Sequence, residues 1–331
     1  MKPSFAQLRA YLSEVPSREC WWKIVSLLDT WEEDVSLAMD YTKAALEDTS
    51  WSGLNVPSQV WSKSSRGWEL SLMKRHTIVS LPNAEEVFCP AGKYWGGSPE
   101  TDGDADDDEY PWREMEVNDN LWCQTTLVTQ EQWSTLMGNN PAECKGDQHP
   151  VEYVNFYDAA AFCNALSRAE GLEEAYILTD EQNEPGSRDY SARIQWKGFE
   201  SPGYRIARET EWEYLCRAGS EKSRYAPLED VAWYSGNTDD MVTMPVGLKE
   251  PNAWGLYDML GNVFEWVWSH WDTSEPGFHD TRLEFTKAAE QVPLRGGSTF
   301  YSENDARCAA RVNCDTFYKY GDMGFRVVRN A

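Results

Sequence analysis

The sequence predicts an α+β protein in which a helical segment precedes a larger domain of short strands and turns. In residues 1–75, apolar side chains recur at helical spacing. From His76 onward, short apolar runs alternate with turn residues and leave room for two helices. The chain has 331 residues, more than a typical single domain. We therefore expect a helical extension (1–75) and one main domain (76–331).

The extension contains large apolar residues at helical intervals, and it is poor in glycine and proline as far as Asp48. Ser4 and Ser17 are suitable N-caps. These features predict two or three helices, followed by an irregular, tryptophan-rich stretch over 50–68. The extension either caps the main domain or forms a separate partner-binding module. The density of large apolar residues favours the cap, because such residues need cover.

Composition limits the possible partners. The formal net charge is −25, which repels phosphate backbones and anionic lipids, so neither nucleic acid nor a membrane is expected as a partner. Basic proteins or divalent cations suit this charge better. The acidic run over 102–109 lacks the register of an EF-hand and predicts a solvated loop.

The compartment is inferred from the amino terminus and the cysteines. The first residues lack the apolar run of a secretory signal, and no stretch approaches the length of a membrane span. The eight cysteines are scattered without CxxC pairs, as is typical of reduced, buried thiols. We therefore predict a cytoplasmic protein.

Two helices of the main domain have local start and stop signals. Thr129 and Gln132 can form a capping box, and Gly138 can end that helix. A second helix is predicted after Asn155 and ends near Gly171. We assign neither helix any chemistry.

A third helical segment follows Arg208 and carries Glu211 and Glu213. Two carboxylates at this spacing are compatible with acid and base catalysis. The nearby Arg205, Arg208 and Arg217 favour structural ion pairs instead.

Two segments near the end of the chain resemble one known family. The first runs from Trp254-Gly255-Leu256-Tyr257-Asp258 to Gly261-Asn262-Val263-Phe264-Glu265-Trp266, and the second contains Arg295-Gly296-Gly297-Ser298 and Gly324-Phe325-Arg326-Val327-Val328. Together they are similar to the formylglycine-generating enzyme (sulfatase-modifying factor) family. The resemblance covers about 77–330 and implies a C-type-lectin-like fold.

The resemblance also implies a structural calcium ion. The matching family positions are Asp258, Gly261, Val263 and Glu265, where two side-chain oxygens and two backbone carbonyls would bind the ion. Calcium prefers such hard oxygen ligands. The alternative is that Asp258 and Glu265 only brace the turn through hydrogen bonds.

The catalytic residues of the family are absent. Its enzymes hold copper with two cysteines shortly after the Arg-Gly-Gly-Ser turn, but residues 298–307 contain no cysteine. A redox pair of Cys308 and Cys314 is the remaining possibility of this kind. A second enzymatic branch binds iron through three histidines, largely from a helical partner domain, and residues 1–75 contain none. We therefore expect neither copper nor iron, and no catalytic residue.

The segment between the two family landmarks predicts a binding surface. Aromatic rings alternate there with small polar groups, a composition typical of protein-binding surfaces. The predicted ligand-binding residues are Thr299, Phe300, Tyr301, Ser302, Val312, Asn313, Phe317, Tyr318, Tyr320 and Asp322. Their pattern resembles the variable proteins of diversity-generating retroelements, although ordinary divergence of a surface loop explains it equally well.

These observations predict a non-catalytic, intracellular binding or scaffold protein whose partner is another protein. Stand-alone relatives of this kind imply a bacterial signalling or defence setting, including CRISPR-associated ones, or a retroelement-diversified protein. The alternative is a metal-dependent oxidase that acts on a cysteine-containing protein. Carbohydrate is not expected as a ligand, because the chain lacks the Glu-Pro-Asn type of sugar-binding motif.

Overall fold

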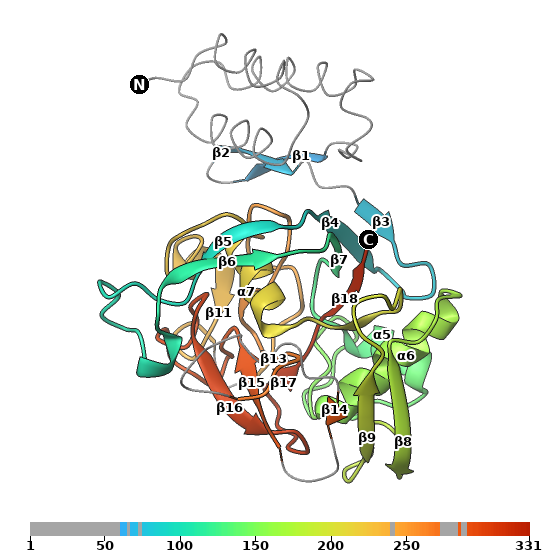
Figure 1. Cartoon of the computed structure of the whole chain (residues 1–331). Coiled ribbons are helices and arrows are strands. Elements are labelled where there is room, and N and C mark those ends of the chain that lie inside the picture. The colour runs from blue at the N-terminus through green and yellow to red at the C-terminus, as the bar shows by residue number, and fades with distance from the viewer. Residues whose placement is uncertain (1–59, 65–66, 72–74, 239–241, 272–283, 286–289) are drawn as a thin grey trace, which may run out of the picture. The chain divides into compact units, whose positions relative to one another are not determined.

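The computed structural model describes residues 60–331 except for 65–66, 72–74, 239–241, 272–283 and 286–289 (Figure 1). The chain divides into two compact units. One comprises Met1–Arg75 with Ala253–Gly255, and the other comprises His76–Asn252 with Leu256–Ala331. The helices predicted in the extension lie outside the described residues.

Part of the stretch predicted to be irregular is a hairpin. β1 (Val60–Ser64) pairs antiparallel with β2 (Gly67–Ser71). The prediction for 50–68 was therefore wrong over the residues of this hairpin.

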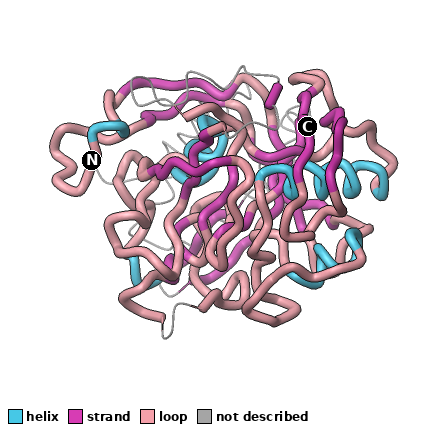
Figure 2. The backbone as a smooth tube through the Cα atoms, turned by 90° about the horizontal axis from the view of Figure 1, so that it is seen from below, coloured by secondary structure: helices cyan, strands magenta, loops and turns pink. Residues whose placement is uncertain are grey.

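Over its described residues, the larger unit combines several small sheets with four α-helices and one short 3-10 helix. Figures 1 and 2 show how these elements are arranged. The five-stranded sheet has the order β10-β18-β7-β4-β3, and the four-stranded sheet has the order β16-β15-β13-β17. The strands of the first are β3 (Arg75–Thr77), β4 (Glu85–Cys89), β7 (Leu121–Gln124), β10 (Arg205–Ile206) and β18 (Val327–Asn330). Those of the second are β13 (Phe264–Trp266), β15 (Gln291–Arg295), β16 (Arg311–Asp315) and β17 (Met323–Gly324).

Smaller sheets complete this unit. β14-β9-β8 form a three-stranded sheet, β5 pairs with β6 antiparallel, and β11 pairs with β12 in parallel. Their bounds are β5 (Gly92–Gly96), β6 (Arg113–Val117), β8 (Tyr176–Gln182), β9 (Ser191–Trp196), β11 (Ala232–Trp233), β12 (Leu260–Gly261) and β14 (Glu284–Phe285). The helices are the short 3-10 helix η1 (Asp107–Glu109), α5 (Gln130–Met137), α6 (Phe156–Ala169), α7 (Glu209–Arg217) and α8 (Leu228–Val231). No helix in the described ranges is long and apolar enough to cross a bilayer.

The predicted start and stop of α5 are confirmed. The Thr129 side chain accepts a hydrogen bond from the Gln132 backbone N–H (3.2 Å), and the Gln132 side chain accepts one from the Thr129 N–H (3.1 Å). Gly138 ends the helix at φ 76°, a left-handed conformation that favours glycine. The second predicted helix is α6, which Asn155 caps and which ends at Ala169.

Stacked rings join these helices to the sheets. Trp133 of α5 stacks on Phe162 of α6 with centroids 5.6 Å apart, and Phe325 meets Phe162 edge to face at 5.4 Å. Trp266 of β13 donates from its indole N–H to the Val154 carbonyl (2.9 Å), so its polar atom is satisfied inside the core.

The carboxylates of α7 form structural ion pairs, as the sequence predicted. Glu211 receives hydrogen bonds from Arg205 on both oxygens (2.6 and 2.9 Å), and Arg208 also pairs with it (2.8 Å). Glu213 lies between Arg217 (2.7 Å) and Arg295 (2.8 Å). These carboxylates are buried and fully paired, which fits a structural role.

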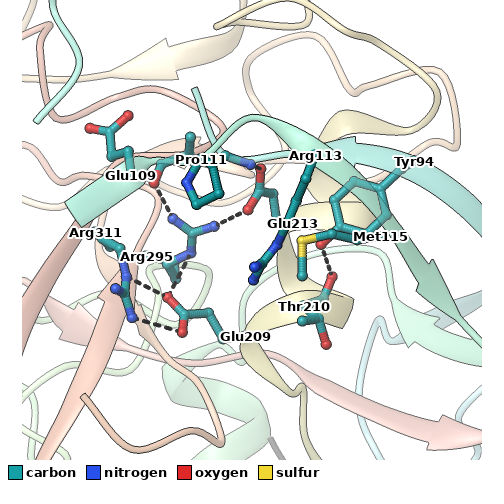
Figure 3. A pocket seen from close by; sticks show the side chains of 12 residues that line it. Tyr94, Glu109, Pro111, Arg113, Met115, Glu209, Thr210, Glu213, Arg295 and Arg311 are labelled. Carbon is teal, nitrogen blue, oxygen red and sulfur yellow. Dashed lines mark hydrogen bonds and ion pairs between the residues drawn. The ribbon is translucent and has the colours of Figure 1, made fainter. Parts of the chain in front are cut away.

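The network continues to the strands β15 and β16. Figure 3 shows Arg295 of β15 between Glu209 and Glu213, with Arg311 of β16 forking onto Glu209 (2.8 and 2.9 Å). The cavity among these side chains has a volume of about 10 Å³, which holds at most about one water molecule. It is therefore a packed ionic joint and has no room for a substrate.

Glu109 corrects the prediction made for the acidic run 102–109. The acidic run 102–109 was expected to be a solvated loop, but Glu109 is buried and pairs with Arg307 through both oxygens (2.7 and 2.5 Å). The other acidic side chains of the run are partly or fully exposed. The sequence hid the distinction because the partner of Glu109 lies near the other end of the chain.

We predict that Arg295→Met destabilises the protein strongly. The variant would leave Glu213 and Glu209 with one fewer cation in a buried site, and breaking a buried pair of this kind costs about 3 to 5 kcal/mol. Urea unfolding followed by tryptophan fluorescence measures the change.

Lys93→Met is the matched control, because Lys93 forms an ion pair with Glu114 (2.7 Å) in which both side chains are more than half exposed. We expect no measurable change for it. Equal losses in the two variants would show that the buried network does not hold the fold together.

Candidate ligand-binding site

The described structure brings most of the predicted binding residues together at one cavity. β16 pairs antiparallel with β15, with Val312 opposite Leu294 and Cys314 opposite Val292. The chain then returns through 316–322 to β17, which pairs in parallel with β13 and places Met323 opposite Phe264. This return creates a cavity of about 380 Å³, within the range of ligand pockets.

We call this cavity the aromatic pocket. It is lined by Phe264, Gln291, Leu294, Phe300, Tyr301, Val312, Asn313, Cys314, Asp315, Tyr318, Tyr320, Asp322 and Met323. All predicted ligand-binding residues are among them except Thr299, Ser302 and Phe317.

The loop that closes the pocket is held by buried polar contacts. Lys319 points inward, pairs with the fully buried Asp158 at the start of α6 (2.5 Å) and donates to the Ser187 carbonyl. The Thr316 hydroxyl bonds to the Tyr157 hydroxyl (3.0 Å). The Tyr153 N–H donates to the Tyr320 carbonyl (3.0 Å). Residues whose side chains or backbone are held by buried hydrogen bonds thus alternate along the loop with exposed aromatic rings.

Three predicted residues lie elsewhere. Thr299 is fully buried, and its backbone N–H donates to the Asn262 carbonyl (3.0 Å). Ser302 is exposed and bonds to Asp305 (3.0 Å) outside the pocket. Phe317 lines a second cavity of about 480 Å³, which also contains Tyr318. The ring of Tyr318 therefore belongs to both cavities.

Sequence reasoning missed several residues that line the aromatic pocket. They are Phe264, Gln291, Leu294, Asp315 and Met323. Phe264 and Met323 face one another only because two distant strands pair in register. Asp315 directly follows the predicted segment 312–314, so its position was the one available signal.

Burial and the acidic groups of the pocket raise the pKa values of neighbouring side chains. Burial raises the pKa of Asp322, whose carboxylate accepts a hydrogen bond from Ser298 (2.9 Å). Burial, and then the nearby Asp315 and Asp322 carboxylates, raise the pKa of the Cys314 thiol to about 12. Burial, and then Asp322, also raise the pKa of Tyr301. Cys314 is therefore a protonated thiol at neutral pH.

The two cysteines considered as a redox pair have different neighbours. Cys308 is fully buried and its pKa is affected by Cys216, whereas Cys314 lines the aromatic pocket. The Cys216 contact, followed by Arg217, lowers the pKa of Cys308 against the effect of burial. The pair of buried thiols is thus Cys216 with Cys308, which the sequence did not reveal.

The histidines do not assemble into a site within the described residues. His76 contacts Glu86 (3.0 Å), His149 contacts the Thr243 hydroxyl (3.1 Å), and His279 lies outside the described ranges. Over the part of the chain that the structure describes, no three His, Cys, Asp or Glu side chains are grouped so that they could hold a metal ion.

In the turn predicted to bind calcium, Glu265 is paired with an arginine, Arg326. Both oxygens of Glu265 accept hydrogen bonds from the buried Arg326 (2.7 and 2.9 Å). Asp258, at φ +53°, accepts one from the Gly247 N–H (2.8 Å), while its other oxygen is buried without a hydrogen bond from a described residue. Gly261 has φ +79°, and a Cβ there would lie 2.2 Å from the Trp233 carbonyl oxygen. Val263 is fully buried.

Calcium needs six or more oxygen ligands, and both oxygens of Glu265 already accept hydrogen bonds from Arg326. An ion held by both carboxylates would lie beside a buried guanidinium. Calcium at this turn stays a prediction, and bracing of the turn by hydrogen bonds describes the observed contacts better.

The fold and the site together define a class. The chain has the mixed α+β, C-type-lectin-like fold of formylglycine-generating enzymes. The family model for the sulfatase-modifying factor enzyme 1-like domain matches residues 73–331, so the chain belongs to this family.

The relatives with similar sequences include proteins named for different functions. The chain is 32% identical over 227 residues to the chaperone protein LppX of Paenibacillus barcinonensis, covering 61% of this chain and 78% of that protein. It is 25% identical over 214 residues to the formylglycine-generating enzyme of Mus musculus, which covers 59% of this chain and 48% of the enzyme. The chain thus matches about half of that enzyme.

Solved structures agree on the fold. Variable protein 1 of Treponema denticola is 27% identical with a TM-score of 0.60, covering 78% of this chain and 99% of that structure. PvdO of Pseudomonas aeruginosa is 23% identical with a TM-score of 0.62, covering 78% and 98%. The likeness to PvdO concerns the fold alone.

We predict that Asp258→Asn makes the protein more stable at about pH 8 but not at about pH 4. Burial raises the pKa of Asp258 from 3.8 to about 6, so between these values the folded state holds a proton that the unfolded chain releases. Stability from this group is therefore lost as pH rises through that window. The effect corresponds to about 3 kcal/mol above pH 6. Urea unfolding of both proteins at the two pH values measures it.

The same experiment, repeated with excess CaCl₂ and with EDTA, tests the calcium prediction. From the contacts of Glu265 we expect identical unfolding curves for the wild type in both. A calcium-dependent gain that Asp258→Asn abolishes would reinstate the ion. An Asp258→Asn variant that is less stable at both pH values would contradict the buried, uncompensated charge.

Proposed function

We propose that this chain is a binding protein that recognises a segment of another protein in the aromatic pocket. The observation that carries the proposal is that residues from two separated segments, 300–301 and 312–322, meet around one cavity of about 380 Å³. The pocket offers exposed tyrosines, which contribute large contact areas at little cost in side-chain entropy.

The local geometry suits recognition. Tyr301 packs edge to face on Phe264 (5.0 Å), and Tyr318 and Tyr320 lie 5.9 Å apart, so the rings hold one another in place. Tyr301, Tyr318 and Tyr320 are each more than 40% exposed. Rigid, exposed aromatic side chains around a cavity are typical of the few residues that dominate binding energy.

The comparisons support a protein partner. One relative is named a chaperone protein, and a structure of similar fold is named a variable protein. We extend this only to the kind of ligand. A cytoplasmic location, a CRISPR-associated or other defence setting and diversification by a retroelement stay predictions from resemblance.

The alternative function is a metal-dependent oxidase, which kinship with formylglycine-generating enzymes favours. Its thiols would be Cys308 and Cys216 rather than Cys308 and Cys314, because Cys216 is the thiol that interacts with Cys308. It predicts stoichiometric copper or iron after purification and oxygen uptake with a cysteine-containing peptide. Cys216→Ser or Cys308→Ser would abolish both.

We predict that Tyr301→Ala and Tyr320→Ala each weaken peptide binding at least tenfold, because central aromatic residues dominate such interfaces. Peptides are selected from a random display library on the full chain, and their affinities for wild type and variants are measured by calorimetry. Leu248→Ala is the control, since Leu248 is 60% exposed and does not line the pocket. Selected peptides that bind all four proteins equally would refute the pocket as the site.

A further inference from the structure

Among the residues that the structure describes, the lining of the aromatic pocket contains two carboxylates and no basic side chain. Asp315, at the end of β16, and Asp322, just before β17, both line it. Asp322 accepts a hydrogen bond from Ser298, but neither carboxylate forms an ion pair with a described residue. In the same unit, the buried Glu209, Glu211 and Glu213 are all paired with arginines. The pocket is therefore an exception to the charge pairing of the surrounding fold.

Aromatic faces surround these carboxylates. Phe264, Phe300, Tyr301, Tyr318 and Tyr320 all line the cavity. The face of an aromatic ring carries partial negative charge and attracts cations, most strongly where water is partly excluded. Rings and carboxylates thus favour the same sign of ligand charge.

The titration of pocket groups agrees with this. The carboxylates contribute to the raised pKa of both Cys314 and Tyr301, and Asp315 and Asp322 act on Cys314 in the same direction. No cation contributes to the pKa shift of either Cys314 or Tyr301. Among the described residues, no basic side chain in the lining of the pocket offsets this negative charge.

We propose that the aromatic pocket binds the side chain of a lysine or arginine in the partner protein. This rests on the proposed function and names the chemistry that the pocket selects. The cationic head lies against the rings of Tyr301 and Tyr320 and is neutralised by Asp315 and Asp322. The aliphatic stem packs on apolar lining residues such as Leu294 and Met323.

Two further features favour a basic protein segment. The chain has a net charge of −25, which draws basic partners toward it before contact. The neighbouring cavity, which shares Tyr318, is lined by Arg188 and Lys319 as well as Asp189, so it lacks the uncompensated negative charge. The charge selection is confined to the aromatic pocket.

The test compares Asp315→Asn/Asp322→Asn with Asp189→Asn. Asparagine at 322 can still accept from Ser298, and burial disfavours the charge there, so we expect the double variant to fold. Asp189→Asn removes a carboxylate from the adjacent cavity as the matched control. Circular dichroism and unfolding curves confirm that all three proteins are folded.

The first measurement uses peptides selected on the wild-type chain. We expect them to be enriched in Lys or Arg. Replacing that residue by norleucine should weaken binding at least tenfold, as should the double Asp variant. Asp189→Asn should change the affinity less than twofold. Added salt should weaken wild-type binding more than binding to the double variant.

The second measurement uses capped lysine and capped arginine as N-acetyl methylamides, detected by saturation-transfer NMR and by competition with a selected peptide. Capped norleucine and capped glutamate are the controls. Stronger binding of the cationic probes supports the inference, and equal or weaker binding overturns it.

The two proposals fail in different ways. Peptides that need Tyr301 and Tyr320 but carry no Lys or Arg would overturn the cation inference and leave the proposed function in place. If no selected peptide depends on the tyrosines, both are overturned. Unchanged affinity in the double Asp variant also overturns the cation inference.

Discussion

The structure depends above all on the pairing of buried carboxylates on α7 with arginines from distant segments. Glu209 and Glu213 hold Arg295 of β15, and Glu209 also receives Arg311 of β16. Removing charges from water is costly, so these groups are tolerated only while every partner is in place. One helix therefore fixes the position of two strands, and the aromatic pocket lies along the same two strands.

This arrangement separates the frame from the ligand-facing side. Arg295 and Arg311 point from β15 and β16 into the ionic joint, whereas Leu294 and Val312, directly beside them on the same strands, line the pocket. Toward the loop, Asn313, Cys314 and Asp315 all line the pocket, so the separation of faces holds only near the joint. Alternation along a strand sends neighbouring side chains to opposite faces. The pocket can thus carry uncompensated charge and exposed rings without weakening the joint, because the two sets of side chains do not compete for the same partners.

Local patterns predicted much of the fold, and long-range pairing accounts for most of what they missed. The capping box of Thr129 and Gln132 and the ion pairs of Glu211 and Glu213 involve neighbours in sequence, which is why they could be predicted. The partners of Glu265, Cys308 and Glu109 lie far along the chain, at Arg326, Cys216 and Arg307. Most pocket residues were predicted from composition, but Phe264 and Met323 required the strand register. Thr299, expected at the surface, is buried in a turn that bonds to the distant Asn262 carbonyl.

The inward-pointing Lys319 has a consequence for how this protein can change. Its ammonium group is fixed to Asp158 inside the molecule, while Phe317, Tyr318 and Tyr320 on either side of it face outward. The backbone of the loop is thus secured by a residue that does not line the aromatic pocket. Mutations at the neighbouring positions can alter what is recognised while the path of the chain stays the same, so new specificities are accessible in single steps without a prior gain in stability.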